Sequence, residues 1–412
     1  MPEAGSTRVW AEVGGSAPTT DRVHFLMFDA TGYGGVARTV TRLAGHLAET
    51  HEVHLHSLLR NADDPPYPID PRVTVTWMVD NRRGRRHRGR PRHDPWARPR
   101  WRRLDRLPSA LEPEQGISAY TDLLLRRELP KLAPGVLVTT RPMLHLAAAR
   151  WAPDRVLHIA QDHLNFELRM RNPTITAMLD QAVPTVDAFV TLTRADRRDY
   201  ERRYPGTLIE QIPNASPFPL GARALLTDKI VVSAGRLTGR KGFDRLIQAW
   251  GPVAGRFPDW QLHIYGEGEC RPGLEQQVHR LGLTDSVRLP GHTADIETAL
   301  MNAGVYAMSS RVEGFPMVLL EAMTHGLPLV AFDCPRGPAE IIEDGVNGRL
   351  VDDHDVAGYS RALAELVADS ERRRCMGAAS YARARSFQIE TVGEEWDNLF
   401  AEVLDRRLAG VE

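Results

Sequence analysis

The chain has 412 residues, of which 42% are hydrophobic and 25% charged, and its formal net charge is -1. This composition excludes a wholly disordered chain, and the balanced charge gives no reason to expect nucleic acid as the partner. Three scattered cysteines exclude a disulfide framework and indicate a reducing cytoplasm. The length predicts two domains with a cleft between them.

Residues 1–20 predict a flexible leader, because they lack the basic start and apolar run of a signal peptide. Charges interrupt every apolar run before it reaches the ~18 residues that span a bilayer. We therefore expect a cytoplasmic protein whose membrane contact, if it has one, is peripheral at the inner face of the plasma membrane.

An N-terminal domain is predicted over residues 21–215. It opens with an apolar strand, a glycine loop, a helical pattern and a second apolar strand, an order typical of a parallel sheet. Apolar runs predict strands over residues 23–28, 53–59, 73–79, 135–140, 155–161 and 188–193.

One insert in this domain, residues 81–106, contains twelve arginines and two tryptophans. One interpretation is a solvated loop, as is usual for blocks of like charge. The other is a patch running from Arg82 to Arg106 that contacts an anionic acceptor or a membrane surface, with Trp96 and Trp101 as interfacial anchors. No RNA-binding or DNA-binding module accompanies the patch, so nucleic acid is not expected.

Residues 212–226 are rich in proline, glycine and small side chains and predict a linker. A C-terminal domain is predicted over residues 216–388. Its strands are expected within residues 229–236, 261–268, 286–292, 304–310, 327–332 and 348–351. The two series predict an α/β protein of two doubly wound, Rossmann-like domains that face a central cleft. Residues 389–412 predict an amphipathic helix that returns toward the N-terminal domain.

The loop GYGGVA, residues 32–37, matches the dinucleotide fingerprint G-x-G-x-x-A after a strand. An NAD(P)-dependent oxidoreductase is therefore one hypothesis, although the second strand ends at Arg60 where that site needs an acid. The amides of Gly34 and Gly35 also suit a phosphate or a sugar hydroxyl at a helix N-terminus. A tight turn without a ligand is the third interpretation.

A second glycine loop follows the strand that ends near residue 234. It sets Arg236 and, five residues later, Lys241 just before a helix. Two cations beside glycine backbone and a positive helix end favour a diphosphate site. The alternative is a basic turn on the surface.

The stretch EGFPMVLLEAMTHG, residues 313–326, contains two glutamates. Pro316 suits the first turn of a helix, which puts Glu313 in the preceding loop and Glu321 inside the helix. The rise from Pro316 to Glu321 is about 7.5 Å, so the two acids would reach different parts of one extended ligand. Burying Glu321 among apolar residues is costly, which favours a functional role over a core carboxylate paired with an arginine.

Metal ligands are not indicated by the sequence. No pair of aspartates ends a predicted strand, and VDDHD, residues 351–355, predicts an exposed turn.

These motifs resemble the retaining glycosyltransferases of family 4, also called glycosyl transferases group 1, which have the GT-B fold. The resemblance rests on residues 309–351 together with GRLTGRKGFDRLIQAW and YGEGE upstream, in the family's order. In the first domain it rests on GYGGVAR, QDH and IPNAS.

The resemblance implies a role for each motif. Arg236 and Lys241 would neutralise the nucleotide diphosphate, Glu313 would contact donor sugar hydroxyls, and Glu321 would bind the ribose diol. His163, in QDH, resembles a histidine that touches the donor sugar, with a purely structural or surface histidine as the alternative. Further donor contacts are implied for Gly235, Gly291, His292, Gly314, Phe315, Pro316 and Met317, while Gly34 and Gly35 resemble a loop over the phosphates and the acceptor.

The reaction implied is transfer of a sugar from a nucleotide sugar, with a UDP-sugar favoured, to an acceptor hydroxyl. The family suggests retention at the anomeric carbon, no metal and no cofactor beyond the donor. The acceptor expected is a bacterial cell-surface polysaccharide, a teichoic-acid-like polymer or a lipid-linked glycan, with a small-molecule natural product as the rival. The oxidoreductase and a non-catalytic scaffold that binds a membrane or a polymer are hypotheses of other classes.

Overall fold

The computed structural model describes residues 18–82 and 118–410, and the chain divides into two units. Unit 1 comprises residues 1–212 and 393–412, and unit 2 comprises residues 213–392. The sequence predicted these divisions after residues 215 and 388. Most of the predicted leader and all of the arginine-rich insert beyond Arg82 lie outside the described residues.

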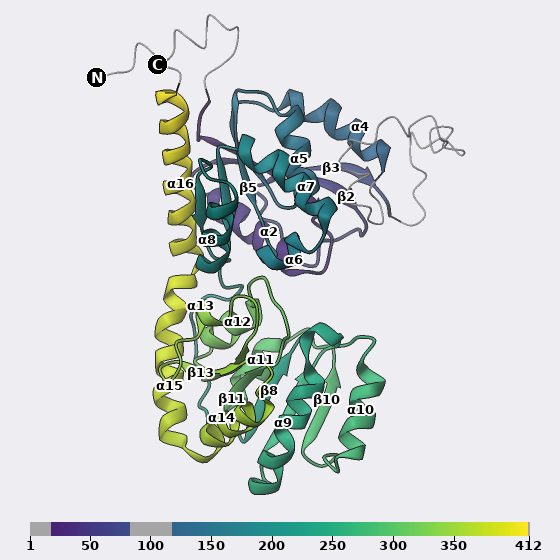
Figure 1. The fold of residues 1–412 in the computed structure, drawn as a ribbon, viewed down its shortest axis with the longest axis vertical. Coiled ribbons are helices and arrows are strands. Elements are labelled where there is room, and N and C mark those ends of the chain that lie inside the picture. The colour runs from purple at the N-terminus through teal and green to yellow at the C-terminus, as the bar shows by residue number, and fades with distance from the viewer. Residues whose placement is uncertain (1–17, 83–117, 411–412) are drawn as a thin grey trace, which may run out of the picture. The chain divides into compact units, whose positions relative to one another are not determined.

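Unit 1 contains a sheet of seven parallel strands in the order β3-β2-β1-β4-β5-β6-β7 (Figure 1). The strands are β1 (Arg22–Asp29), β2 (Glu52–Arg60), β3 (Thr74–Asp80), β4 (Gly135–Thr139), β5 (Val156–Gln161), β6 (Ala188–Thr191) and β7 (Ile209–Gln211). Six were predicted to within two residues, and β7 was missed. The strand order reverses between β1 and β4, and ligands of such sheets bind at the carboxyl ends beside that reversal.

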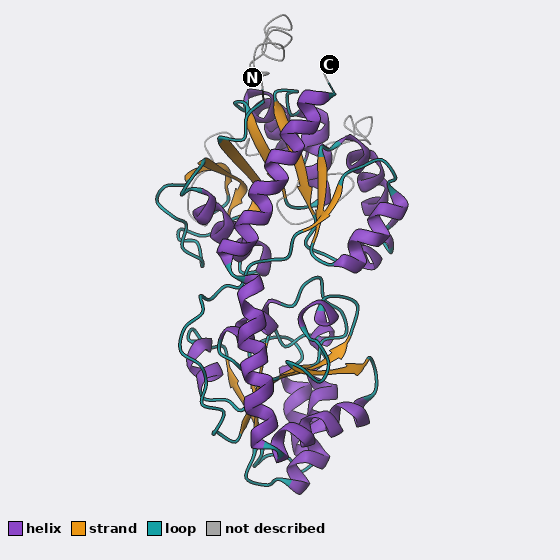
Figure 2. Cartoon of the chain, turned by 90° about the vertical axis from the view of Figure 1, so that its left-hand side faces the viewer, coloured by secondary structure: helices purple, strands orange, loops and turns teal. Residues whose placement is uncertain are grey.

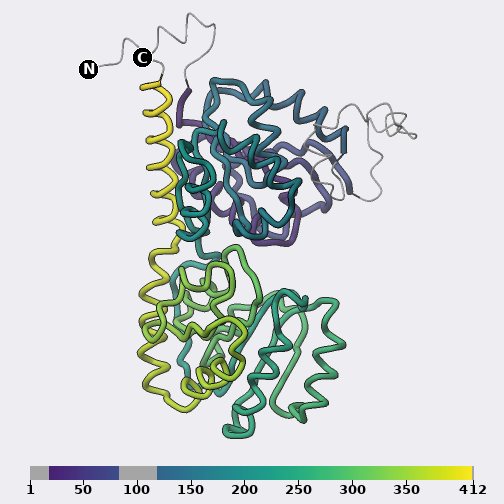
Figure 3. Tube along the Cα trace, viewed as in Figure 1, coloured from purple at the N-terminus to yellow at the C-terminus, as the bar shows by residue number. Residues whose placement is uncertain are grey.

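The helices of unit 1 lie on both sides of this sheet (Figures 1 and 2). They are α2 (Gly35–Leu47), α4 (Ala119–Glu128), α5 (Pro142–Trp151), α6 (Phe166–Met170), α7 (Pro173–Ala182), α8 (Arg194–Arg203) and the unit 1 part of α16 (Ile389–Ala409). In α16, Trp396 and Phe400 are buried, and Nε of Arg407 donates to Asp187 at 2.8 Å. These contacts hold residues 393–409 to unit 1, as the yellow end of the trace shows (Figure 3).

Unit 2 contains a sheet of six parallel strands in the order β10-β9-β8-β11-β12-β13. The strands are β8 (Ile230–Ala234), β9 (Gln261–Tyr265), β10 (Val287–Gly291), β11 (Val305–Met308), β12 (Leu329–Asp333) and β13 (Gly348–Asp352). The helices are α9 (Phe243–Arg256), α10 (Arg271–Arg280), α11 (Ile296–Met301), α12 (Met317–Thr324), α13 (Pro338–Ile341), α14 (Val356–Ala368) and α15 (Ser370–Arg383). All six strands coincide with the predicted runs.

The central strands of unit 2 are buried on both faces. Val305 and Ala307 of β11 belong to the core that α9 and α14 cover, while Tyr306 and Met308, also buried, point to the opposite face. Burial on both faces explains why these strands read as continuous apolar runs instead of alternating patterns.

The loop after β9 lies against the loop after β8. Gly266 has a φ of 139°, and a Cβ atom built there would lie 1.9 Å from the carbonyl oxygen of Gly235. The Gly235 amide donates to the carbonyl of Tyr265 at 3.0 Å, and the Gly266 amide donates to that of Gly291 at 2.8 Å. The absence of a side chain at Gly266 therefore brings the ends of β8, β9 and β10 together.

We expect Gly266→Ala to lower the free energy of unfolding by about 2 kcal/mol or more, because the new methyl group meets backbone at a φ that alanine disfavours. Chemical denaturation followed by circular dichroism measures this change. Gly255→Ala is the matched control, since Gly255 is exposed in α9 with no atom near its Cβ position. A Gly266→Ala protein as stable as the control would contradict the packing described.

Candidate active site

The candidate active site of unit 2 is centred on Lys241 and Glu313. Lys241 follows β8 and Glu313 follows β11, and these two strands are neighbours in the parallel sheet, so both loops emerge at its carboxyl edge. The ammonium of Lys241 lies 2.6 Å from Oε1 of Glu313, and the Ser310 hydroxyl donates to the same oxygen at 2.6 Å. Glu313 is only 6% exposed.

The Lys241–Glu313 ion pair is largely shielded from water. Removing a carboxylate and an ammonium from water costs free energy that their attraction repays only in part. Lys241 stays partly accessible, with 19% of its side chain exposed, so an anion can reach it. The pair therefore joins a reachable cation to a nearly buried carboxylate, which suits a ligand that has both a phosphate and hydroxyl groups.

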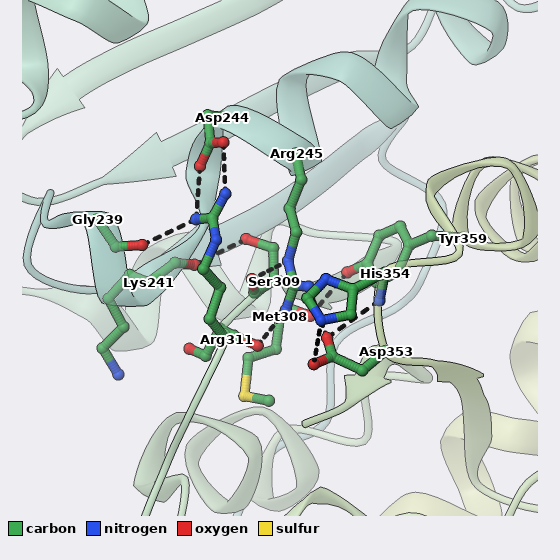
Figure 4. A network of polar contacts seen from close by, with 11 residues as sticks. Gly239, Lys241, Asp244, Arg245, Met308, Ser309, Arg311, Asp353, His354 and Tyr359 are labelled. Atoms are coloured by element: carbon green, nitrogen blue, oxygen red, sulfur yellow. Dashed lines mark hydrogen bonds and ion pairs between the residues drawn. The ribbon is translucent and has the colours of Figure 1, made fainter. Parts of the chain in front are cut away.

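The loop that contains Lys241 is held in place by Arg311. Its guanidinium donates to the Gly239 carbonyl at 2.8 Å and to both carboxylate oxygens of Asp244 at 2.8 and 2.6 Å (Figure 4). These bonds tie the short turn Gly239–Lys241 to the first turn of α9. Arg236, in the same loop, is exposed.

Glu321 lies inside α12 and is 7% exposed. The helix begins at Met317, one residue after the predicted Pro316, and Gly314, Phe315 and Pro316 are buried before it. Burial holds the pKa of the Tyr306 hydroxyl well above its usual range. The charge of Glu321 and, more weakly, that of Glu313 add to this shift.

The Tyr306 hydroxyl accepts a hydrogen bond from the Ala234 amide at 3.3 Å, at the end of β8. The charges of both glutamates oppose ionisation of this phenol. Glu313 lies in the loop after β11, and Glu321 lies in α12, which follows that loop.

The remaining residues predicted for the donor lie at the same edge of the sheet. Gly291 is buried at the end of β10, and its carbonyl accepts the Gly266 amide. Gly235 follows β8 directly, and His292 follows Gly291 and is exposed. Gly235, Gly291 and His292 thus follow or end strands of the same parallel sheet as the loops that contain Lys241 and Glu313.

Unit 1 contains a cavity of about 510 Å³ at the carboxyl ends of β1, β4 and β5. It is lined by Met27, Phe28, Asp29, Gly32, Tyr33, Gly34, Val36, Ala37, Thr140, Arg141, His163, Leu164 and Arg169. Gly34 is the residue before α2 and Gly35 is its first residue. The cavity therefore brings Gly34, at the N-terminus of α2, together with His163. The sequence predicted these two residues as separate parts of the site.

His163 has an unusual environment. Both ring nitrogens are buried, and neither has a hydrogen-bond partner among the described residues. Burial lowers the pKa of His163 to about 4, with the charge of Asp162 opposing and that of Arg169 adding to the shift. The imidazole is therefore neutral at pH 7, with one donor and one acceptor that a ligand hydroxyl can use.

Two family models match the chain. The model described as Glycosyltransferase Family 4 matches residues 33–215, and the one described as Glycosyl transferases group 1 matches residues 222–383. An uncharacterized glycosyltransferase of Haemophilus influenzae is 31% identical over 245 residues, which cover 59% of this chain and 69% of that protein. The chain belongs to the GT-B glycosyltransferases.

The chain is also similar to one further relative and to a solved structure. The exopolysaccharide phosphotransferase of Streptomyces coelicolor is 34% identical over 392 residues, which cover 94% of this chain but 41% of that protein. The chain thus spans about two fifths of that relative's length. Anabaena HepE, solved in complex with UDP, matches with a TM-score of 0.69 at 16% identity, covering 92% of this chain and 100% of HepE. Its likeness confirms the predicted fold of two Rossmann-like domains.

Several residues at the glycosyltransferase sites were not predicted. Ser310 and Arg141 each stand just after a buried strand, β11 and β4, and polar residues at carboxyl ends of parallel strands are the signal that finds them. Arg169 is different, because it reaches the cavity through a buried ion pair with Asp162 at 2.6 Å, and nothing local in the sequence indicates that pairing.

Two details of the predictions need correction. Arg82, the first arginine of the proposed anion-binding patch, is only 7% exposed and pairs with Asp80 and Asp63, so it is not available to an acceptor or a membrane. The segment 351–355, predicted as an exposed turn, begins within β13, and its Asp353 is half-buried and pairs with Arg245 at 2.6 Å. The rest of the arginine patch lies outside the described residues.

Within residues 18–82 and 118–410, no three potential metal ligands are placed to hold a metal ion. Over the same ranges no helix has the length and apolar character that a membrane span requires.

Burial also lowers the pKa of three more histidines of unit 1. Burial lowers the pKa of His24 and of His158 to about 3, and that of His56 to about 4. His24 and His56 face each other, with Nδ1 and Nε2 3.2 Å apart, so a charge on either ring opposes a charge on the other.

We expect the free energy of unfolding to fall as the pH falls from about 6.5. The unfolded chain protonates these histidines near their ordinary pKa, whereas the folded chain takes up the protons only near pH 4 and below, so acid favours the unfolded state. Denaturation curves between pH 6.5 and 5, above the titration of ordinary carboxyl groups, measure the slope. The double variant with His24→Gln and His56→Gln should have a shallower slope, and an equal slope would show that the two rings are not buried neutral.

Proposed function

We propose that unit 2 binds a nucleoside diphosphate sugar and that the protein transfers the sugar to a hydroxyl of a glycan acceptor. The observation that carries the proposal is the Lys241–Glu313 pair at the carboxyl edge of the sheet. A cation for the diphosphate and a carboxylate for the sugar hydroxyls lie next to each other there. The UDP bound to the structurally similar HepE supports a UDP-sugar as the donor.

Each residue has a role in this proposal. The ammonium of Lys241 and the guanidinium of Arg236 take the diphosphate, together with amides at the start of α12. Glu313 accepts hydrogen bonds from the sugar. Glu321, more than one helical turn farther along the chain, accepts them from the ribose diol, so one extended ligand is held at both ends.

The chemistry proposed is displacement at the anomeric carbon. The bond from that carbon to the phosphate oxygen breaks, the electron pair leaves with the nucleoside diphosphate, and the acceptor oxygen forms the new bond. Lys241 and Arg236 stabilise the charge that develops on the leaving phosphate, a task for which fixed cations suffice without a metal. Attack on the face that the phosphate leaves, with the phosphate taking the acceptor proton, gives retention.

The acceptor is proposed to be a cell-surface glycan. The support is the Streptomyces relative, whose name specifies exopolysaccharide. The unit 1 cavity offers the neutral imidazole of His163 and the exposed ring of Tyr33, groups that suit hydroxyls and the flat face of a sugar. A small-molecule natural product is the second candidate, favoured only by the size of this cavity.

Two other hypotheses lose their support. Membership of the glycosyltransferases argues against an oxidoreductase. In addition, β2 ends at Arg60, where a dinucleotide site needs an acid, and the guanidinium of Arg60 lies 4.9 Å from the centre of the Trp77 ring. A non-catalytic scaffold does not require the costly burial of Glu313 beside Lys241.

Removing the charges should abolish most of the activity. We expect Lys241→Ala and Glu321→Ala each to lower the rate of sugar transfer by roughly 10² or more, because each loses a preorganised contact to the donor. Radiolabelled transfer from a UDP-sugar measures the rates. Lys229→Ala is the control, since Lys229 pairs with Asp259 on the surface of the same unit. Rates equal to that control would refute the proposed site.

The donor can be identified by thermal stabilisation against UDP-, GDP- and ADP-sugars. A donor at 100 times its dissociation constant should add about 2.7 kcal/mol to the free energy of unfolding. We expect one nucleotide class, UDP, to stabilise the protein and Lys241→Ala to lose the effect. Stabilisation by none of the three classes would count against a nucleotide-sugar donor.

A further inference from the structure

One buried arginine contacts the backbone that supports the proposed donor site. Arg245, in the first turn of α9, is 4% exposed. Its Nε donates to the Ser309 carbonyl at 2.8 Å, and one terminal nitrogen donates to the Ser310 carbonyl. The other terminal nitrogen lies 2.6 Å from Asp353 (Figure 4). The guanidinium also lies 3.8 Å from the centre of the Phe332 ring.

The two serines that Arg245 holds are in turn bonded to the proposed donor residues. The Ser309 hydroxyl donates to the backbone carbonyl of Lys241 at 3.0 Å. The Ser310 hydroxyl donates to the carboxylate of Glu313 at 2.6 Å. One dipeptide at the end of β11 therefore contacts both partners of the central ion pair, Lys241 through its backbone carbonyl and Glu313 through its carboxylate.

The loops are packed so closely that their spacing depends on this dipeptide. A Cβ atom at Gly242 would lie 2.1 Å from the Ser309 carbonyl oxygen, and Gly242 has a φ of 64°. The same oxygen accepts from Arg245. A shift of Ser309 would therefore move the residue next to Lys241.

The chemistry of arginine fits this task and that of lysine does not. The fork of the guanidinium donates to two successive carbonyls and to a carboxylate at once, and its flat face lies on an aromatic ring. An ammonium at the end of a flexible stem is a point charge and cannot reproduce those directions.

We propose that Arg245 is a positioning residue for sugar transfer. It fixes the Ser309–Ser310 dipeptide, whose hydroxyls hold Lys241 and Glu313 at the separation that the donor needs. Arg245 does not contact the donor itself. The inference rests on the proposed function, and it adds a residue that acts only through others.

A role in stability alone is the competing explanation, because any buried ion pair destabilises the fold when one partner is removed. The two explanations predict different effects on the transfer rate when the residues that Arg245 positions are changed. A positioning residue matters for rate only while the residues that it positions are present, whereas a structural residue lowers activity in every background.

The test is a double-mutant cycle with Arg245→Lys and Ser310→Ala, each made in the wild-type protein and in Glu313→Gln. We expect kcat/KM for transfer to fall about tenfold or more in the wild-type background, because small displacements of preorganised groups are costly. In the Glu313→Gln background we expect a smaller further loss, because only the part transmitted through Ser309 to Lys241 remains. The shift of the denaturation midpoint caused by Arg245→Lys should be the same in both backgrounds.

Controls separate the outcomes. Arg349→Lys weakens an ion pair with Glu365 that is more exposed than that of Arg245, and Ser286→Ala removes a serine hydroxyl bonded to Trp250, both elsewhere in unit 2. Ser310→Ala keeps the test valid if Arg245→Lys does not fold. Equal losses in the two backgrounds, or none in the wild type, would overturn the positioning role. If Glu313→Gln alone leaves transfer unchanged, the proposed function itself fails.

Discussion

The contact between Lys241 and Glu313 is the interaction on which the rest of unit 2 converges. The two residues are 72 positions apart, yet their charged atoms lie 2.6 Å from each other. The ammonium and the carboxylate neutralise each other in a site that water reaches poorly. A ligand that competes for one of the two charges therefore affects the other. In the proposed function, a diphosphate takes the ammonium and leaves the carboxylate to the sugar hydroxyls, so that binding would exchange one charged contact for two.

The fold builds this contact from simple parts. Parallel strands deliver their loops to one edge of the sheet, and Gly242 and Gly266 let the loops approach at backbone distance. Unit 1 uses the same edge differently. Its cavity contains a histidine that burial keeps neutral, and the charge of Arg169 is balanced by Asp162. One unit thus offers a cation and a carboxylate, and the cavity of the other combines the neutral imidazole of His163 with the side chains of Asp29 and Arg141.

Much of this could be predicted because burial on both faces leaves a plain pattern in a strand. The runs around Val136–Val138 and Val305–Met308 read as strands for that reason. The order of strands, and hence the meeting of Lys241 with Glu313, is a tertiary property that the family resemblance suggested and spacing alone did not contain. The pairing of Arg245 with Asp353, 108 positions apart, has no local pattern, and β7 is too short to show a periodicity.

The most direct test compares how UDP and the UDP-sugar selected by thermal stabilisation bind to wild-type protein and to Glu313→Ala, by calorimetry. Because Glu313 occupies the Lys241 ammonium, its removal should leave the affinity for UDP unchanged or stronger while the affinity for the UDP-sugar falls toward that for UDP. If Glu313→Ala weakened UDP and the UDP-sugar equally, the carboxylate would be acting only as a support for the loop, and the claim that the pair divides a donor into phosphate and sugar would be contradicted.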